Sequence, residues 1–219
     1  VFDRNSKRIL FDKNSTEKIP IASTTKILTC IIALETLDFN KNPIYTISQN
    51  AASATGSTLG LKYNKTISLQ DLLYGLMLRS GNDCAILLAE IISGDVNSFS
   101  LLMNQKAKEL NLTDSNFTTP HGLDQENHYS TAYDLAILTD YALNNPIFKQ
   151  IVSSKEKNIV LNGIPTTINN TNELLGNYDG IYGVKTGFTF NAGRCLISAY
   201  KNSDFDLIIA VLGANSKSI

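Results

Sequence analysis

The chain has 219 residues, 43% of them hydrophobic, which is enough to bury a full core as one domain. Its formal net charge is −1, from 19 basic and 20 acidic residues that are interspersed along the sequence. This balance excludes a polybasic surface that would bind nucleic acid or a membrane, and no apolar run is long enough to span a bilayer.

The chain opens with strand-like sequence and continues into a helix. Residues 1–12 predict a β-hairpin with a polar turn. Apolar residues recur at helical spacing over 24–37, and Pro20 requires this helix to begin after it. Residues 40–67 are polar and irregular, so no regular element is predicted there.

Capping signals delimit the central helices. Ser68 precedes Asp71 by three residues, and Thr131 precedes Asp134 by three, which is the spacing of a capping box at a helix start. Loop 113–129 holds both histidines. The predicted helices cover residues 69–78, 85–92, 96–110 and 132–143.

Strand patterns dominate the sequence from residue 158 onward. Asn162-Gly163 between two β-prone runs is a strong hairpin signal. Strands followed by helices and again by strands predict an antiparallel sheet built from both chain ends, with a helical lobe between them. The predicted strands cover residues 158–161, 165–168, 181–186, 193–200 and 205–212.

Ser23 and Lys26 lie three residues apart where the first helix is predicted to begin. This spacing places both side chains on one helix face, about 5–6 Å apart at Cβ. A serine hydroxyl is a weak nucleophile that needs an adjacent base, and lysine serves as that base only where burial or a nearby cation lowers its pKa. Lys185 is a candidate for that cation. Alone, however, the pair also fits an ordinary helix start.

Two further motifs add polar side chains of the kinds that acyl transfer needs. Ser80-Gly81-Asn82 interrupts a helical pattern, and its hydroxyl can relay a proton while its amide contacts a substrate. Lys185-Thr186-Gly187 lies on a predicted strand, where lysine and threonine can bind a carboxylate and glycine lets a substrate approach closely. Taken singly, Ser80-Gly81-Asn82 also fits a simple turn between helices, and Lys185-Thr186-Gly187 also fits a surface strand with a charged end.

The remaining reactive side chains favour structural roles. His121 and His128 lie in the 113–129 loop, where a histidine base for Ser23 is the alternative to loop-ordering hydrogen bonds, which we favour for His121. No third ligand stands at a spacing that would complete a zinc site. The cysteines stand among apolar residues, which favours small buried side chains over disulfides or a catalytic thiol: they are Cys30, Cys84 and Cys195.

The order Ser-x-x-Lys, Ser-x-Asn, Lys-Thr-Gly resembles that of the penicillin-recognising serine enzymes. Longer stretches narrow the resemblance to the low-molecular-weight D-alanyl-D-alanine carboxypeptidases, peptidase family S11, over essentially the whole chain. These stretches are residues 22–29, 77–83, 120–124, 129–136 and 183–189.

The resemblance implies an α/β (α+β sandwich) fold in which helices flank an antiparallel five-stranded sheet and a mainly helical lobe is inserted. Residues 1–219 would form one catalytic domain, with a sheet-containing lobe from 1–40 and 151–219 and a helical lobe over about 41–150. We expect a signal peptide, a C-terminal β-rich domain and a membrane anchor to lie outside this chain.

The implied activity is removal of the terminal D-Ala from peptidoglycan stem peptides through an acyl-enzyme on Ser23, without metal or cofactor. Lys26 would be the base and Ser80 the proton shuttle, and the backbone N–H groups of Ser23 and Phe188 would form the oxyanion hole. β-Lactams would acylate the same serine and inhibit the enzyme. The implied substrate-binding residues are Asn82, Lys185, Thr186, Gly187 and Phe188.

The same resemblance implies an extracytoplasmic location, at the outer face of the bacterial cytoplasmic membrane, with any membrane attachment through a segment not present here. Two alternatives stay open. A class A-like β-lactamase needs a glutamate that activates the deacylating water, and Glu173 is the candidate, although it precedes Lys185 by only about a dozen residues. A non-catalytic relative would only bind cell-wall peptide.

Overall fold

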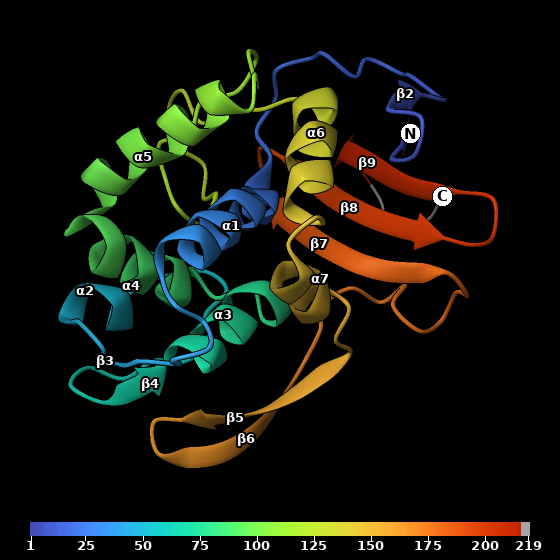
Figure 1. The fold of residues 1–219 in the computed structure, drawn as a ribbon. Coiled ribbons are helices and arrows are strands. Elements are labelled where there is room, and N and C mark those ends of the chain that lie inside the picture. The colour runs from blue at the N-terminus through green and yellow to red at the C-terminus, as the bar shows by residue number, and fades with distance from the viewer. Residues whose placement is uncertain (216–219) are drawn as a thin grey trace.

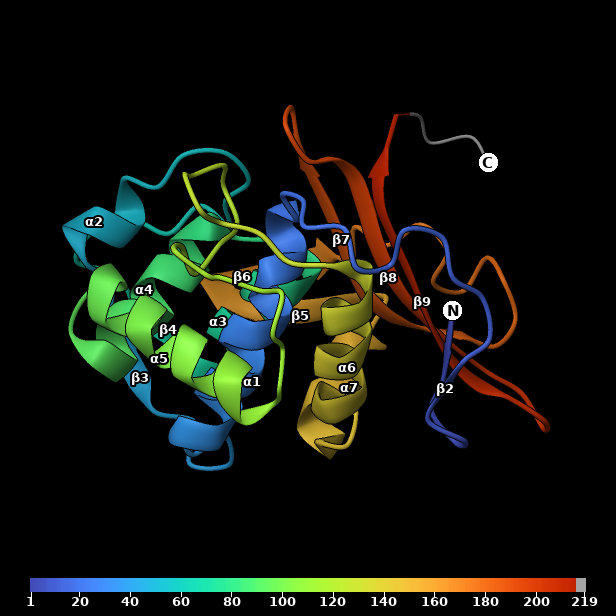
Figure 2. The ribbon, with the colours of Figure 1, turned by 90° about the horizontal axis from the view of Figure 1, so that it is seen from above.

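The computed structural model describes residues 1–215, in which helices lie to one side of a five-stranded antiparallel sheet (Figures 1 and 2). The strand order is β2-β1-β9-β8-β7. Phe2 pairs with Ile208, so both ends of the chain build the sheet, as the sequence predicts. The strands are β1 (Phe2–Asp3), β2 (Arg8–Ile9), β7 (Ile181–Thr189), β8 (Gly193–Lys201) and β9 (Asp206–Ala214).

The predicted fold class is confirmed, because helices flank this antiparallel sheet. A 3-10 turn, η1 (Ala22–Thr25), leads into α1 (Lys26–Thr36), the central helix, which contacts α3 to α7. The expected single helix over 24–37 therefore begins as a tighter turn, a common start for an α-helix. The lobe boundaries expected from the sequence stay a prediction; α6 and α7 contact strands of the sheet.

Both predicted helix caps form, through the hydroxyl half of each capping box. Ser68 Oγ accepts a hydrogen bond from the Asp71 backbone N–H at 3.2 Å, and Thr131 Oγ1 accepts one from Asp134 at 3.0 Å. Each bond satisfies one backbone donor that the first helical turn leaves free. The helices opened by these caps belong to a longer set: α2 (Gln49–Ala52), α3 (Leu69–Leu78), α4 (Asn82–Ser93), α5 (Val96–Glu109), α6 (Ala132–Ala142) and α7 (Pro146–Val152).

Several elements differ from the prediction. Helix α7 is not among the predicted helices. It begins shortly after the predicted helix 132–143 ends, because Asn145 caps it and Pro146 fits its first turn. The region 40–67 holds helix α2 and a small ribbon of β3 (Ile44–Thr46) and β4 (Thr66–Ser68). The predicted Asn162-Gly163 hairpin forms, as β5 (Glu156–Leu161) and β6 (Ile164–Asn169), beside α3 and apart from the main sheet.

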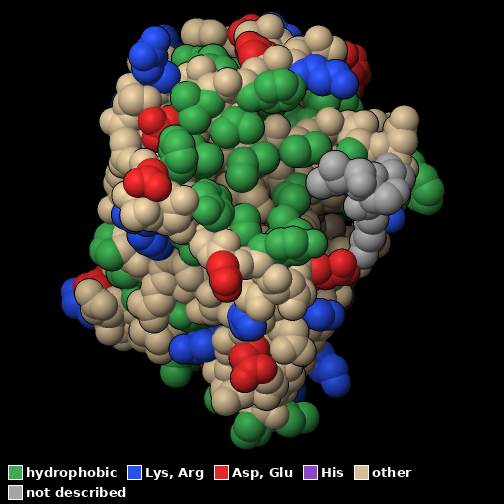
Figure 3. Space-filling model, turned by 90° about the vertical axis from the view of Figure 1, so that its right-hand side faces the viewer, with side chains coloured by type: hydrophobic (Ala, Val, Ile, Leu, Met, Phe, Trp, Pro, Cys, Tyr) green, Lys and Arg blue, Asp and Glu red, His purple; other side chains and the backbone are tan. Residues whose placement is uncertain are grey.

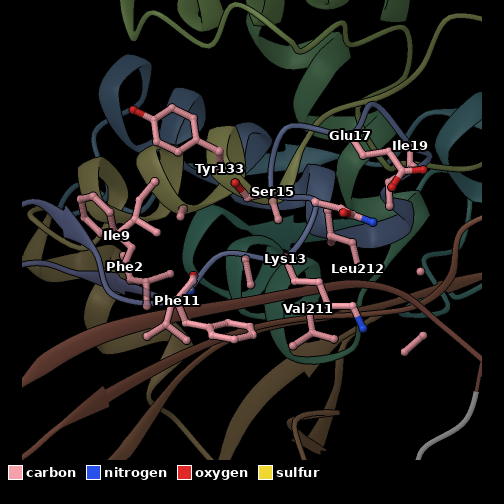
Figure 4. A pocket seen from close by; sticks show the side chains of 18 residues that line it. Phe2, Ile9, Phe11, Lys13, Ser15, Glu17, Ile19, Tyr133, Val211 and Leu212 are labelled. Atoms are coloured by element: carbon pink, nitrogen blue, oxygen red, sulfur yellow. The ribbon is translucent and has the colours of Figure 1, made fainter.

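The sheet face seen in Figure 3 carries many apolar side chains. A cavity of about 680 Å³ lies between the N-terminal segment, β9 and the start of α6. Figure 4 shows Phe2, Ile9, Phe11 and Tyr133 among the side chains that line it. No residue of the three sequence motifs lines this cavity, so the candidate chemistry lies elsewhere.

Within residues 1–215, no single helix is long and apolar enough to cross a membrane. Helices α4 and α5 reach that length and apolar composition only when taken together, and the pair is bent by 84°.

Candidate active site

Residues of the first two motifs meet around the amine of Lys26, and Lys185 of the third motif acts on it through its charge. Lys26 Nζ lies 2.8 Å from Ser23 Oγ and 2.8 Å from Asn82 Oδ1. The third neighbour is the backbone carbonyl oxygen of His121, at 2.7 Å. The carbonyl and amide oxygens can only accept a hydrogen bond, whereas the Ser23 hydroxyl can also donate one. The arrangement therefore suits a neutral amine that donates to the two oxygens and accepts the serine proton.

Burial lowers the pKa of Lys26 well below its usual value, because a charged ammonium is costly where water is excluded. The nearby positive charge of Lys185 lowers this pKa further, whereas Asp83 and Cys84 act in the opposite direction. Burial also lowers the pKa of Lys185, to about 7. The site thus provides both conditions that the sequence analysis sets for Lys26, burial and a neighbouring cation.

The break between α3 and α4 places Ser80 and Asn82 in the site. Ser80 has a φ of 58°, in the left-handed region, and accepts a hydrogen bond from Lys185 Nζ at 3.0 Å. Asn82 is the first residue of α4, and its Nδ2 donates to the carbonyl oxygen of Thr55 at 2.7 Å. The amide oxygen of Asn82, Oδ1, faces Lys26. The expected contact of Asn82 with a substrate stays a prediction.

Strand β7 brings the third motif against η1. A Cβ added at Gly187 would lie 3.0 Å from the backbone nitrogen of Ser23 and 3.1 Å from Ala22 Cβ. Only glycine leaves room for this approach of the strand to the serine. The strand extends three residues beyond its predicted end, so Gly187 and Phe188 belong to it. Phe188 is about half exposed.

The hydroxyl of Thr186 also has a partner that the sequence did not reveal. Thr186 Oγ1 lies 2.8 Å from Thr171 Oγ1, in the segment that joins β6 to β7. The Thr171 backbone N–H donates to the carbonyl oxygen of Leu78, at the end of α3. Thr171 therefore connects the sheet edge with the helices beside it.

Both histidines order the 113–129 loop. His121 Nδ1 accepts a hydrogen bond from the Leu123 backbone N–H, which confirms the predicted loop-ordering role. His128 Nδ1 accepts one from the Thr118 N–H. Burial lowers the pKa of His121 to about 3 and that of His128 to about 4. Both rings are therefore neutral at pH 7, and the contribution of His121 to the site is its carbonyl oxygen.

The three cysteines are buried and free, as the sequence predicts. Burial raises the pKa of the Cys30 and Cys84 thiols, which disfavours a reactive thiolate. Among residues 1–215, no group of three or more His, Cys, Asp or Glu side chains is arranged to hold a metal ion. Glu173, the candidate for a β-lactamase-like glutamate, is exposed in the segment between β6 and β7.

Comparison with known proteins agrees with this geometry. The family model for D-alanyl-D-alanine carboxypeptidases, peptidase family S11, matches residues 1–216. The chain is 36% identical over 220 residues to the D-alanyl-D-alanine carboxypeptidase DacF of Bacillus subtilis, covering 99% of this chain and 57% of DacF. It is 36% identical over 230 residues to DacC of Escherichia coli, covering 100% of this chain and 56% of DacC. The chain thus spans somewhat more than half the length of these two relatives.

Solved structures give the same result. A D-alanyl-D-alanine carboxypeptidase from Mycobacterium tuberculosis superposes with a TM-score of 0.91 at 33% identity, covering 96% of this chain and 80% of that one. A variant of a Streptomyces DD-transpeptidase superposes with a TM-score of 0.92 at 30% identity, covering 98% and 89%. The Ser23–Lys26 pair, the full-length family match and these superpositions together place the chain in the D-alanyl-D-alanine carboxypeptidase family, peptidase family S11.

Proposed function

We propose that this protein is a serine-type D-Ala-D-Ala carboxypeptidase that removes the terminal D-Ala from peptidoglycan stem peptides. The observation that carries the proposal is the contact of Lys26 Nζ with Ser23 Oγ at 2.8 Å. Burial and Lys185 lower the pKa of this amine, so its neutral form is available to take the serine proton. Family membership supports the substrate class.

In the first step, Lys26 removes the proton from Ser23 Oγ, and the oxygen attacks the carbonyl carbon of the penultimate D-Ala. The backbone N–H groups of Ser23 and Phe188 stabilise the negative charge that develops on the carbonyl oxygen. The close approach of Gly187 to Ser23 supports this pairing of donors, because it brings β7 beside the nucleophile. The proton is now held by Lys26.

In the second step, the tetrahedral intermediate collapses to an ester on Ser23 and expels the terminal D-Ala, whose nitrogen must receive a proton. Ser80 carries that proton from Lys26 to the nitrogen, and Lys185 Nζ holds the Ser80 hydroxyl in the site with a hydrogen bond of 3.0 Å. Lys185 and Thr186 bind the terminal carboxylate of the substrate, and Asn82 contacts the peptide. Burial lowers the pKa of Lys185 to about 7 in the free protein. The negative charge of a bound carboxylate favours the charged form of Lys185 and so raises this pKa again.

Water then hydrolyses the ester and frees Ser23, leaving a stem peptide shortened by one residue. A β-lactam follows the same first step, because its strained amide resembles the D-Ala-D-Ala end, and remains bound to Ser23 as an ester. The substrate belongs to the bacterial cell wall, so the proposed location is extracytoplasmic, at the outer face of the cytoplasmic membrane. That the two relatives named above come from bacteria supports this assignment.

The proposal is tested by measuring D-Ala release from a peptide that ends in D-Ala-D-Ala, in parallel with mass spectrometry after exposure to penicillin. We expect D-Ala release together with a stable adduct on Ser23, and neither in Ser23→Ala. Rapid turnover of penicillin, with the enzyme free afterwards, would instead identify a β-lactamase. A protein that forms no adduct and releases no D-Ala would be a binding relative.

A further inference from the structure

The carboxylate of Asp83 is buried next to the proposed active site but touches neither Ser23 nor Lys26. It follows Asn82 in the first turn of α4 and is 2% exposed. Its Oδ1 accepts hydrogen bonds from the backbone N–H groups of Leu59 and Cys84, both at 2.9 Å. Besides a side-chain contact with the Cys84 thiol, this carboxylate accepts from backbone N–H groups, most of them in a segment more than twenty residues earlier.

The second carboxylate oxygen completes that contact. Asp83 Oδ2 accepts hydrogen bonds from the N–H groups of Gly60, at 2.8 Å, and Leu61, at 3.0 Å. Three consecutive backbone donors therefore converge on one side chain. Residues 53–61 contain no helix or strand, so this side chain supplies hydrogen-bond partners that regular structure would otherwise provide.

The segment held by Asp83 in turn holds Asn82. The carbonyl oxygen of Ser57 accepts a hydrogen bond from the Asn82 backbone N–H at 2.7 Å, and that of Thr55 accepts one from Asn82 Nδ2. A Cβ added at Gly56 would lie 2.9 Å from Asn82 Nδ2, so the segment packs tightly on the amide. With Nδ2 bound to Thr55, the amide oxygen must face Lys26.

We propose that Asp83 is a positioning residue for the Lys26–Asn82 pair, which it maintains by fixing segment 55–61 against the start of α4. The inference rests on the proposed function, because the orientation of Lys26 matters for catalysis only if Lys26 is the base. Asp83 acts through Thr55 and Asn82 and makes no contact with the reacting atoms.

Asp83 has a second effect, through its charge. The groups that interact with Lys26 through charge are Lys185 from β7, Asp83 and Cys84 from α4, and His121 and His128 from the 113–129 loop. Asp83 raises the pKa of Lys26 and so opposes the effect of Lys185. Removing this charge lowers the pKa of Lys26 further. The acylation rate falls at low pH as Lys26 becomes protonated, and this acid limb of the pH profile must then move to lower pH. Looser packing without the loss of the charge does not produce such a shift.

The test compares Asp83→Asn with Asp134→Asn, a matched control. Asp134 is also 2% exposed in the first turn of a helix, and it accepts hydrogen bonds from Asp114 and Ser115 of the preceding loop. In Asp83→Asn we expect faster amide exchange at residues 59–61 and penicillin acylation slowed roughly 10- to 100-fold, as for a displaced catalytic group. We also expect an acid limb shifted to lower pH. Asp134→Asn should leave that limb in place.

Gly56→Ala keeps the proposal testable if Asp83→Asn does not fold. Its added methyl meets the Asn82 amide, and its φ of 79° strains an alanine, so the segment and the amide are displaced without any change of charge. Acylation should therefore slow while the acid limb stays where it is. Wild-type acylation rates in either variant, or unchanged exchange at 59–61 in Asp83→Asn, would overturn the inference. If the unaltered protein forms no penicillin adduct, the proposed function fails. Amide exchange and a direct titration of isotope-labelled Lys26 then still report the role of Asp83.

Discussion

Lys185 reaches from strand β7 to Ser80, where its Nζ donates a hydrogen bond to the serine hydroxyl at 3.0 Å. This contact joins the edge strand of the sheet to the break between two helices, across 105 residues of sequence. Lys185 is also close enough to lower the pKa of Lys26. One buried cation thus links the proposed proton shuttle, the proposed base and the proposed carboxylate site.

Lys185→Gln removes that charge while retaining a hydrogen-bonding side chain. Because Lys185 lowers the pKa of Lys26, its removal should raise that pKa and move the acid limb of acylation to higher pH, opposite to Asp83→Asn. The measurement is the rate of penicillin adduct formation as a function of pH. The limb must be compared at saturating penicillin, since the variant also loses carboxylate affinity. An acid limb that stays in place would show that Lys185 does not tune Lys26.

Gly187→Ala should displace β7 from η1, because the added Cβ would lie 3.0 Å from the Ser23 nitrogen and 3.3 Å from the Ile21 carbonyl oxygen. Such displacement of the nucleophile predicts roughly a 100-fold loss of acylation rate. Gly163→Ala is the control: an added Cβ there meets nothing within 4 Å, and only the φ of 86° strains an alanine, in the β5–β6 hairpin turn. The control should lower the melting temperature and acylate normally; equal acylation in both would contradict the prediction.

Thr171→Val removes the hydroxyl that contacts Thr186 Oγ1 while nearly conserving shape. Loss of one such hydrogen bond costs about 1 kcal/mol. This cost corresponds to roughly a fivefold increase in KM for a peptide that carries the terminal carboxylate. We expect kcat to change less, because the nucleophile and base are untouched. The effect should be absent in Thr166→Val, whose hydroxyl is bonded within the exposed β5–β6 hairpin. An unchanged KM in Thr171→Val would show that this contact does not support carboxylate binding.

His128 predicts a loss of stability in acid. Burial lowers its pKa in the folded protein to about 4, below the ordinary value of 6.5. The folded state therefore binds fewer protons, so stabilisation by the neutral ring is complete above pH 6.5 and is lost progressively down to about pH 4. Urea unfolding across this range should show a shallower fall for His128→Gln than for the unaltered protein. Neutral His121 loses stabilisation over a similar pH range. The slope of unfolding free energy against pH should therefore become smaller in His128→Gln but not reach zero.

The sequence predicted the elements whose signals are local. The Ser68 and Thr131 caps and the Asn162-Gly163 turn depend on residues a few positions apart, and all three form as expected. Helix α7 was not predicted, because Asn145 and Pro146 are typical both of the end of one helix and of the start of the next. A local pattern does not separate the two when only three residues lie between the helices.

The site was only partly accessible to the same reasoning. The motifs identified Ser23, Lys26 and Lys185, since each pairing of residue types has a chemical logic that spacing can reveal. Asp83 and Thr171 gave no comparable signal, because they act through residues 22 to 24 and 15 positions away. Such contacts depend on how irregular loops pack against the helices and the sheet. No local pattern in a single sequence indicates this packing.

Strand β9 lies between β1 and β8 in the sheet, although it is the last strand of the described chain. Every residue of the three motifs is therefore synthesised before the strand that joins the N-terminal hairpin to β8 and β7. The sheet closes only through pairings that span about 200 residues, such as Phe2 with Ile208. Loop closure over that distance makes folding slow. A chain that is cut or stalled before residue 206 would carry the complete chemical set but lack the strand that joins the N-terminal hairpin to the rest of the sheet.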